Sequence, residues 1–379
     1  MLEIQTYLLT PGNSLETLAR DYAIKQRVNE LLDVVSLNYD AIASDVSIPM
    51  VGECRALILE LGTWRVMSMP FRRFFNYEEN RCPQFNWEKF DTWEKLDGSL
   101  ISFWSHKEGW QVSTRSNPTG SNTYDECPET FRELVERTLR EMGTSLEEVT
   151  QYFVPECSYA MELQTPETQV VTRVVDRCLS LLAVRNRETL QEVHVHDWHK
   201  IYKTFPLPIV QHYPGFTLDA VKEAVQGRNP LEHEGYVLMD DQFNRIKMKS
   251  SAYVLMSSRR DSLAKSNRAR CELIQLGQDD DVMGILPVFL QERITDLKAR
   301  MSRFSKEIDS DYLKFKHIVD QKEFALRVIK ESIHAPAMFA LRKGFVESGI
   351  EYVREARPAS ILKWVNVKDD DEEESVWIG

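Results

Sequence analysis

The hydrophobic pattern of this 379-residue chain changes its period about two thirds of the way along. Short apolar runs bounded by turn residues fill the first part, as at residues 55–61, 100–104 and 235–239, and such runs are typical of antiparallel strands. Beyond residue 252 apolar residues recur three and four apart, the spacing of one face of a long helix. These residues are Ile294, Leu297, Met301, Phe304 and Ile308. We therefore predict an α+β protein.

The change of period also predicts the domain organisation. We expect antiparallel sheets with interspersed helices over residues 1–252, and an all-helical C-terminal domain over residues 253–379. The run of acidic residues at 369–374 reads as a solvated tail of the second domain.

The charge balance limits where a polyanion can bind. The formal net charge is -12 at pH 7, whereas affinity for phosphates comes largely from Lys and Arg. Any nucleic-acid site must therefore be a local basic groove.

The chain lacks the usual marks of export. No apolar run approaches the length that crosses a bilayer, and residues 1–4 lack the basic and apolar blocks of a secretory signal. The cysteines form no C-x-x-C pair, which favours reduced thiols over a zinc ribbon or a disulfide scaffold. We expect a cytoplasmic protein.

A set of lysines and acids at ordered positions is the main indication of chemistry. Lys95 precedes Asp97 and Gly98, a pattern that taken alone is equally typical of a hairpin turn. Further along come Glu162 after a strand-like run, Glu234 before another, and then Lys247 and Lys249. Two acids and three lysines are thereby expected to share one cleft.

These residue types suit nucleotidyl transfer. A lysine amine attacks phosphorus only when it is unprotonated, so we expect the pKa of Lys95 to be lowered by burial or by the neighbouring charges of Lys247 and Lys249. Those two lysines would also neutralise charge on the transferring phosphate. Glu162 and Glu234 supply the oxygen ligands that Mg²⁺ prefers, and Mn²⁺ can take its place.

The motifs resemble those of the phage-type RNA ligase 1 family, within the covalent nucleotidyltransferase superfamily, over most of residues 36–282. The stretch 95–100 is similar to its adenylylation motif, and the stretches at 161–162, 181–185, 234–237 and 247–250 are similar to its later motifs. Two upstream stretches, 53–55 and 69–76, narrow the resemblance to this family.

The resemblance implies an ATP-grasp-like ligase core and a set of ATP-binding residues. It implies contacts to ATP from the following residues: Arg55, Arg73, Phe75, Glu94, Gly98, Arg115, Glu162, Glu234, Lys247 and Lys249. Arg73 and Arg115 stand where the family has lysines, which changes the hydrogen-bond geometry. Taken singly, the arginines are equally typical of surface cations and Phe75 of a core residue.

Two further acids, Asp280 and Asp281, resemble a family pair that assists the water shell of the catalytic metal. An acidic loop or a helix N-cap explains these aspartates equally well. A histidine-rich segment, residues 194–199, has no Cys or Glu partner at a recognised zinc spacing, so we do not expect zinc there. No adenine-stacking residue is assigned.

The implied activity is ATP-dependent joining of an RNA 5′-phosphate to a 3′-hydroxyl through a lysyl-AMP and an RNA-adenylate. The expected partners are RNA, including tRNA, and a separate end-healing kinase or phosphatase. A DNA ligase and a capping guanylyltransferase share the Lys-x-Asp-Gly pattern, and an RNA-binding protein with an inactive cleft is the alternative of another class. The stretch 53–55 and the helical C-terminal part favour the RNA ligase.

Overall fold

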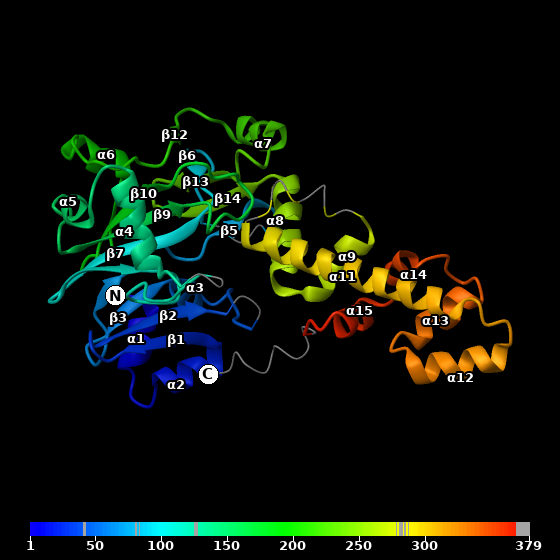
Figure 1. Ribbon diagram of the computed structural model, residues 1–379. Coiled ribbons are helices and arrows are strands. Elements are labelled where there is room, and N and C mark those ends of the chain that lie inside the picture. The colour runs from blue at the N-terminus through cyan, green and yellow to red at the C-terminus, as the bar shows by residue number, and fades with distance from the viewer. Residues whose placement is uncertain are drawn as a thin grey trace. The chain divides into compact units, whose positions relative to one another are not determined.

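The computed structural model describes residues 1–40, 43–79, 82, 84–124, 128–277, 279, 283, 286 and 288–368. It divides into two compact units, Met1–Val254 and Leu255–Gly379 (Figure 1). The first unit holds the sheets and the second is helical, so the predicted α+β class is confirmed. We predicted that two domains meet between residues 252 and 253. That these domains fold separately stays a prediction. None of the helices in the described ranges is long and apolar enough to span a bilayer.

Within its described residues the first unit contains three sheets. The first has the strand order β1 (Ile24–Asn29), β2 (Val34–Tyr39), β3 (Leu57–Glu60), β4 (Val66–Ser68). The second has the order β11 (Glu192–Val193), β10 (Cys178–Asn186), β9 (Cys157–Gln164), β7 (Ser99–His106), β8 (Gly109–Ser113). The third has the order β12 (His212–Tyr213), β6 (Phe90–Lys95), β13 (Gly235–Asp240), β14 (Arg245–Lys249), β5 (Phe75–Asn76). All these strand pairs are antiparallel except β14 with β5.

Several helices of this unit begin at a side-chain cap, among them α2 (Leu15–Tyr22), α4 (Phe131–Glu141), α5 (Leu146–Thr150) and α7 (Leu218–Gly227). Thr130 accepts the backbone N–H of Glu133 at the start of α4, and the Glu133 carboxylate accepts the N–H of Thr130, which satisfies two helix-end donors at once. The apolar face of α4 packs into the core between β7, β9 and β10. The other helices of the unit are α1 (Glu3–Leu9), α3 (Pro49–Glu53) and α6 (Val195–Ile201).

The second and third sheets are joined at the turn between β6 and β7, residues 96–98. Their facing sides share one core, in which Trp93 of β6 and Met239 of β13 lie with Met161 of β9 and Leu181 of β10. Side chains alternate between the two faces of a strand, so polar residues at the ends of these strands meet along one seam between the sheets.

The second unit is built around one long helix, α11 (Val288–Phe315). Of the five residues predicted to form its buried face, four are buried and Phe304 is partly buried, so this prediction is confirmed. The helix α8 (Ser251–Lys265) begins in the first unit and continues into the second. The remaining helices are α9 (Asn267–Gln275), α12 (Gln321–Glu331), α13 (Ala335–Arg342), α14 (Gly349–Glu355) and α15 (Pro358–Trp364).

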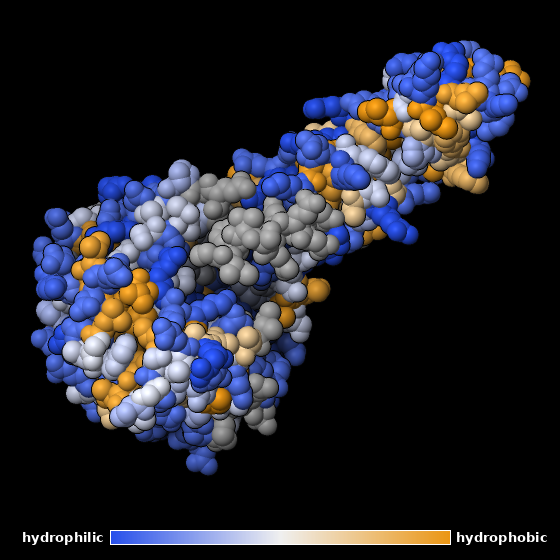
Figure 2. All heavy atoms as spheres, turned by 90° about the horizontal axis from the view of Figure 1, so that it is seen from below, coloured by the Kyte–Doolittle hydropathy of each residue, from blue (hydrophilic) through white to orange (hydrophobic). Residues whose placement is uncertain are grey.

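Not every apolar residue of the second unit is buried. Leu326 and Ile329 on α12, Ile333 after it, and Phe345 after α13 are exposed. Figure 2 shows apolar side chains at the surface of this end of the helical unit.

Candidate active site

Lys95 lies where β6 ends, in an ion-paired group with an acid and a second lysine. Its ammonium is 2.8 Å from Oε2 of Glu234, and the ammonium of Lys249 is 2.6 Å from Oε1 of the same carboxylate. The side chain of Glu234 is only 3% exposed. One buried carboxylate therefore holds two lysines from β6 and β14, the strands on either side of β13 in the third sheet.

The strand register explains why these three residues meet. Gly235 begins β13 between the two lysines, opposite Lys95 on β6 and opposite Lys249 on β14. A side chain on Gly235 would place Cβ 2.0 Å from the carbonyl oxygen of Met248, at a φ of +152°. Only glycine fits here, and its small size lets Glu234 approach both lysines.

Side chains alternate between the two faces of β14, and this alternation places three cations on one face. Ile246 and Met248 are buried in the core on one face, so Arg245, Lys247 and Lys249 share the other face. Lys247 lies 5.9 Å from the centre of the Phe74 ring. A row of three cations thus runs along β14 beside Lys95.

Asp97, two residues after Lys95, has a positioning role. Its buried carboxylate accepts the backbone N–H groups of Val171 and Thr172, at 2.9 and 2.7 Å. The following residue, Gly98, lies so close to β9 that a Cβ would be 2.3 Å from the carbonyl oxygen of Leu163. The turn after Lys95 is therefore fixed from two sides.

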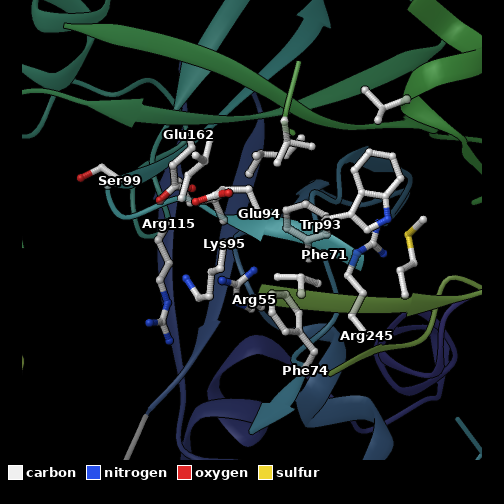
Figure 3. Close-up of a pocket in the computed structure, with 18 of the residues that line it drawn as sticks. Arg55, Phe71, Phe74, Trp93, Glu94, Lys95, Ser99, Arg115, Glu162 and Arg245 are labelled. Atoms are coloured by element: carbon white, nitrogen blue, oxygen red, sulfur yellow. The ribbon is translucent and has the colours of Figure 1, made fainter. Parts of the chain in front are cut away.

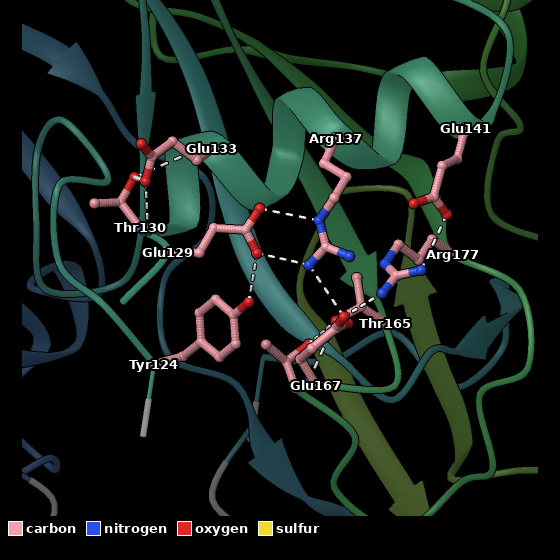
Figure 4. Close-up of polar contacts among 10 residues, drawn as sticks. Tyr124, Glu129, Thr130, Glu133, Arg137, Glu141, Thr165, Glu167 and Arg177 are labelled. Atoms are coloured by element: carbon pink, nitrogen blue, oxygen red, sulfur yellow. Dashed lines mark hydrogen bonds and ion pairs between the residues drawn. The ribbon is translucent and has the colours of Figure 1, made fainter. Parts of the chain in front are cut away.

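The loop that donates to Asp97 is itself held by ion pairs (Figure 4). Glu167 of this loop pairs with Arg137 of α4 at 3.0 Å and with Arg177. Arg137 also pairs with Glu129, which accepts a hydrogen bond from Tyr124. The network connects α4 to the loop and, through the loop, to the turn that follows Lys95.

A cavity of about 440 Å³ opens beside Lys95. Arg55, Arg115, Lys95 and Glu162 lie toward one end of it, and Trp93 and Arg245 toward the other (Figure 3). The apolar side chains Val195, Val210, Val237 and Met239 also line the cavity, and three of them, Val195, Val210 and Met239, belong to the same core as Trp93. The cavity therefore has apolar side chains near Trp93 as well as charged groups, a combination that suits a nucleotide.

Burial and charge shift the proton equilibria at the charged end. Burial alone would lower the pKa of Lys95, but Glu234 and Glu162 outweigh it and raise that pKa. The predicted lowering of the Lys95 pKa is therefore wrong for the protein without ligands. Burial, helped by Lys249 and Lys95, lowers the pKa of Lys247 to about 8. Burial raises the pKa of Glu162 to about 8, although Lys95 and Arg55 oppose it.

The two carboxylates that were predicted to hold a magnesium ion, Glu162 and Glu234, differ in their surroundings. Glu162 takes no hydrogen bond or ion pair from the residues that the structure describes, so its oxygens are available to a cation. Glu234 has both oxygens turned to lysines. In the described ranges no three His, Cys, Asp or Glu side chains gather as a metal cluster would. Asp280 and Asp281 lie outside the described residues.

The structure places the other predicted site residues in two groups. Arg55, Glu94, Gly98 and Arg115 line the cavity with Lys95 and Glu162. The carboxylate of Glu94 also contacts Tyr213 and His233. Arg73 and Phe75 line a second, neighbouring cavity instead.

Tyr39, the last residue of β2, was not predicted. Its ring lies 5.1 Å from the guanidinium of Arg73 and 5.0 Å from that of Arg115. It also interacts electrostatically with the buried guanidinium of Arg55. Tyr39 therefore gathers three arginines that are far apart in the sequence, and its local pattern, the end of an apolar run, gives no sign of this.

Comparisons with known proteins agree with this geometry. A family model described as RNA ligase matches residues 53–253, more than half of the chain. A protein of Autographa californica nuclear polyhedrosis virus, described as a putative bifunctional polynucleotide kinase/RNA ligase, is 28% identical over 313 residues. This match covers 76% of the present chain and only 42% of the viral protein.

Solved structures with weaker similarity include two ligases. An archaeal ATP-dependent RNA ligase has 14% identity and a TM-score of 0.46, over 87% of this chain and 79% of that one. A mutant Naegleria gruberi RNA ligase with ATP and Mn has 16% identity and a TM-score of 0.38, over 48% and 56% of the two chains. The match of the family model over residues 53–253 shows that this chain belongs to the RNA ligase family.

Proposed function

We propose that this protein is an ATP-dependent RNA ligase whose nucleophile is Lys95. The observation that carries the proposal is the position of the Lys95 ammonium, 2.8 Å from Glu234 and on the wall of a cavity that Arg55 and Glu162 also line. An amine, a base for its proton and cations for a phosphate are the groups that covalent nucleotidyl transfer needs.

In the first step Nζ of Lys95 attacks the α-phosphorus of ATP. A P–N bond forms, the bond to the β-phosphate oxygen breaks, and pyrophosphate leaves. Since the pKa of Lys95 is raised, its ammonium must first lose a proton, and Glu234 is the nearest acceptor. Lys249, on the other oxygen of Glu234, and Lys247 bring positive charge to the phosphate in the transition state.

The apolar end of the cavity suits the purine base. Trp93 lies toward this end, while Lys95 and Arg55 lie toward the other (Figure 3). Val237 is the strand partner of Trp93, and Met239 packs in the same core. With its base among these side chains, ATP would direct its phosphates toward the lysines. For reaction, the attacking nitrogen and the phosphorus must lie within about 3–3.5 Å of each other and in line with the bond that breaks. Binding of the base would therefore determine which phosphorus of ATP faces Lys95.

The next two steps use the same groups. An oxygen of the RNA 5′-phosphate attacks the adenylyl phosphorus, the P–N bond breaks, and Lys95 regains its amine. A 3′-hydroxyl then attacks the 5′-phosphorus, loses its proton, and AMP leaves as the strand is sealed. Each step moves a phosphoryl group between anionic partners, so one cation-rich cavity serves all three.

Glu162 and Glu234 would hold the Mg²⁺ that such a reaction uses, and Mn²⁺ has the same preference for oxygen ligands. A bound ion there would polarise the phosphate and balance its charge. The availability of the Glu162 carboxylate supports this assignment.

The partners are proposals of the same kind. We infer that the substrates are RNA 5′-phosphate and 3′-hydroxyl ends, tRNA breaks among them. The viral relative is described as joining a kinase to a ligase, and the chain spans only 42% of that protein. A kinase or phosphatase that heals RNA ends would therefore supply the substrate, and the helical residues 253–379 would select among RNA ends.

Labelling with α-³²P-ATP and Mg²⁺ tests the nucleophile. The wild-type protein should form an acid-labile, base-stable adduct, and Lys95→Ala should form none. Lys89→Ala is the matched control, because Lys89 is a surface lysine paired only with Asp241. An adduct in folded Lys95→Ala refutes the assignment.

The same assay separates the alternatives. Labelling by GTP in preference to ATP would indicate a capping guanylyltransferase, and no labelling at all would indicate an RNA-binding protein with an inactive cleft. Sealing of nicked DNA in preference to RNA ends would indicate a DNA ligase.

A further inference from the structure

A second cavity, of about 280 Å³, adjoins the first. The two share Phe71, Phe74 and Arg245 as walls. Four arginines line the second cavity, Arg72, Arg73, Arg185 and Arg245, and no acidic residue lines it among those that the structure describes. The charged residues that line the second cavity, among those described, are therefore all positive.

Two of these arginines form a buried pair around one acid. Glu192, whose side chain is 3% exposed, bonds Arg185 at 2.7 Å through Oε2 and Arg245 through both oxygens. The side chains of Arg185 and Arg245 are 13% and 10% exposed. One carboxylate cannot neutralise two guanidinium groups, so this pair carries an excess positive charge where solvation is poor.

The arginines also keep hydrogen-bond donors unused. Nε of Arg185 and Nε of Arg73 are buried without an acceptor in the described structure. Among the residues that the structure describes, the one ion-pair partner of Arg73 is Glu79, at the long distance of 3.9 Å. Buried donors without partners cost stability, and an anion in the cavity would remove part of this cost.

A row of cations on β14 leads from the residues around Lys95 to the second cavity. Lys249, Lys247 and Arg245 follow one another on one face of β14, about 6.6 Å apart at the usual rise per strand residue. Lys249 holds Glu234 beside Lys95, and Arg245 is the wall between the two cavities. A polyanion that reaches Lys95 therefore has a further cation row leading to the second cavity.

We propose that the second cavity binds a phosphate of the RNA strand, at a position beyond the end that is joined. This inference rests on the proposed function. Arginine forks match phosphate oxygens in geometry and charge, so the ligand class is a phosphate mono- or diester. The phosphates of ATP share this chemistry, and the experiment separates the two sources.

Arg185→Gln is the test variant, because it leaves Glu192 and Arg245 as a balanced pair. Arg140→Gln removes the same charge from an exposed position on α4 and is the control. Binding of a fluorescent, 5′-phosphorylated oligoadenylate is measured by anisotropy in EDTA over a salt series. The KM for ATP is measured by labelling of the protein in the absence of RNA.

We expect Arg185→Gln to weaken RNA binding by roughly tenfold relative to Arg140→Gln. The slope of log K against log salt should fall by about 0.7, the value of one phosphate contact in single-stranded nucleic acid. The KM for ATP should change much less than the RNA affinity. A rise in the KM for ATP with unchanged RNA binding would assign the cavity to the triphosphate instead, and equal RNA binding by both variants would overturn the proposal.

A second variant covers the case in which Arg185→Gln does not fold. Gln242, an exposed turn residue, lines the same cavity, and Gln242→Glu adds a negative charge without removing a buried group. It should weaken RNA binding several-fold by repulsion, and unchanged binding would again overturn the proposal. Failure of wild-type protein to form the AMP adduct would refute the proposed function alone, because the binding measurement in EDTA does not depend on adduct formation.

Discussion

Glu162→Gln should stabilise the protein without ligands while it abolishes formation of the AMP adduct. Glu162 lies beside Lys95 in the cavity, and burial raises its pKa from the ordinary value of 4.5 to about 8. Between these pH values the folded protein binds a proton at Glu162 that the unfolded chain does not. Stability therefore falls as the pH rises from about 4.5 to about 8. Glutamine resembles the neutral acid and does not titrate.

The size of the effect follows from this difference in pKa. At pH 7, which is 2.5 units above the ordinary pKa of 4.5 and still below the folded-state pKa of about 8, each unit contributes about 1.36 kcal/mol, so the effect is about 3.4 kcal/mol. Glu162 lines an open cavity and is partly exposed, so solvent screening reduces this value. We expect Glu162→Gln to raise the free energy of unfolding by about 1.5–2 kcal/mol at pH 7, and by less than about 0.5 kcal/mol at pH 5.

Urea unfolding in EDTA, followed by tryptophan fluorescence, measures this difference between pH 5 and pH 8. Trp104 is fully buried in the same unit and reports on its unfolding. Glu156→Gln, at an exposed position of the same unit, is the control and should show no such trend. A stability difference that is constant from pH 5 to pH 8 would refute the reasoning, because it would show that Glu162 has the same proton affinity in both states.

Further changes test other parts of the site. Glu234→Gln should lower the adduct formation rate by about 100-fold or more, as measured by α-³²P-ATP labelling, because the lysines lose their shared carboxylate. Arg137→Gln should lower that rate several-fold with little change in the KM for ATP, and Arg137→Lys should restore part of it, if the ion-pair network positions the turn after Lys95. Gly235→Ala should lower the melting temperature sharply, whereas Gly52→Ala, where a Cβ meets no atom within 4 Å, should not. A protein truncated after about residue 285 should still form the adduct, provided that it melts cooperatively, but its selectivity among RNA ends should change. Loss of the adduct in a truncated protein that melts cooperatively would show that the helical part is needed for the chemistry.

The sequence predicted those features that depend on local pattern or on fixed chemistry. Alternating and helical periods gave the strands β3, β7 and β13 and the long helix α11. Lys95, Glu162 and Glu234 were found because nucleotidyl transfer requires these residue types in this order. The structure brings Lys95 and Glu162 to one cavity and pairs Lys95 with Glu234. Their roles in the reaction stay predictions.

Features that depend on long-range pairing could not be predicted. Arg245 and Glu192 are 53 residues apart, and no local pattern links them. Tyr39 belongs to the site through arginines of three different segments. The pKa of Lys95 was predicted with the wrong sign for a similar reason, since the sequence shows two nearby lysines but not that Glu234 lies between Lys95 and Lys249.

The charges of the site explain how a chain with a net charge of -12 can attract a polyanion. The cavity beside Lys95 is lined by the cations Arg55, Arg115 and Arg245 and by the acids Glu94, Glu162 and Glu192. Glu162 is largely neutral below pH 8, and Glu192 is already paired with Arg185 and Arg245. The cavity therefore carries excess positive charge before any ligand binds. Because the interaction between charges is strong where water is scarce, this local excess outweighs the more distant acids, which solvent and salt screen.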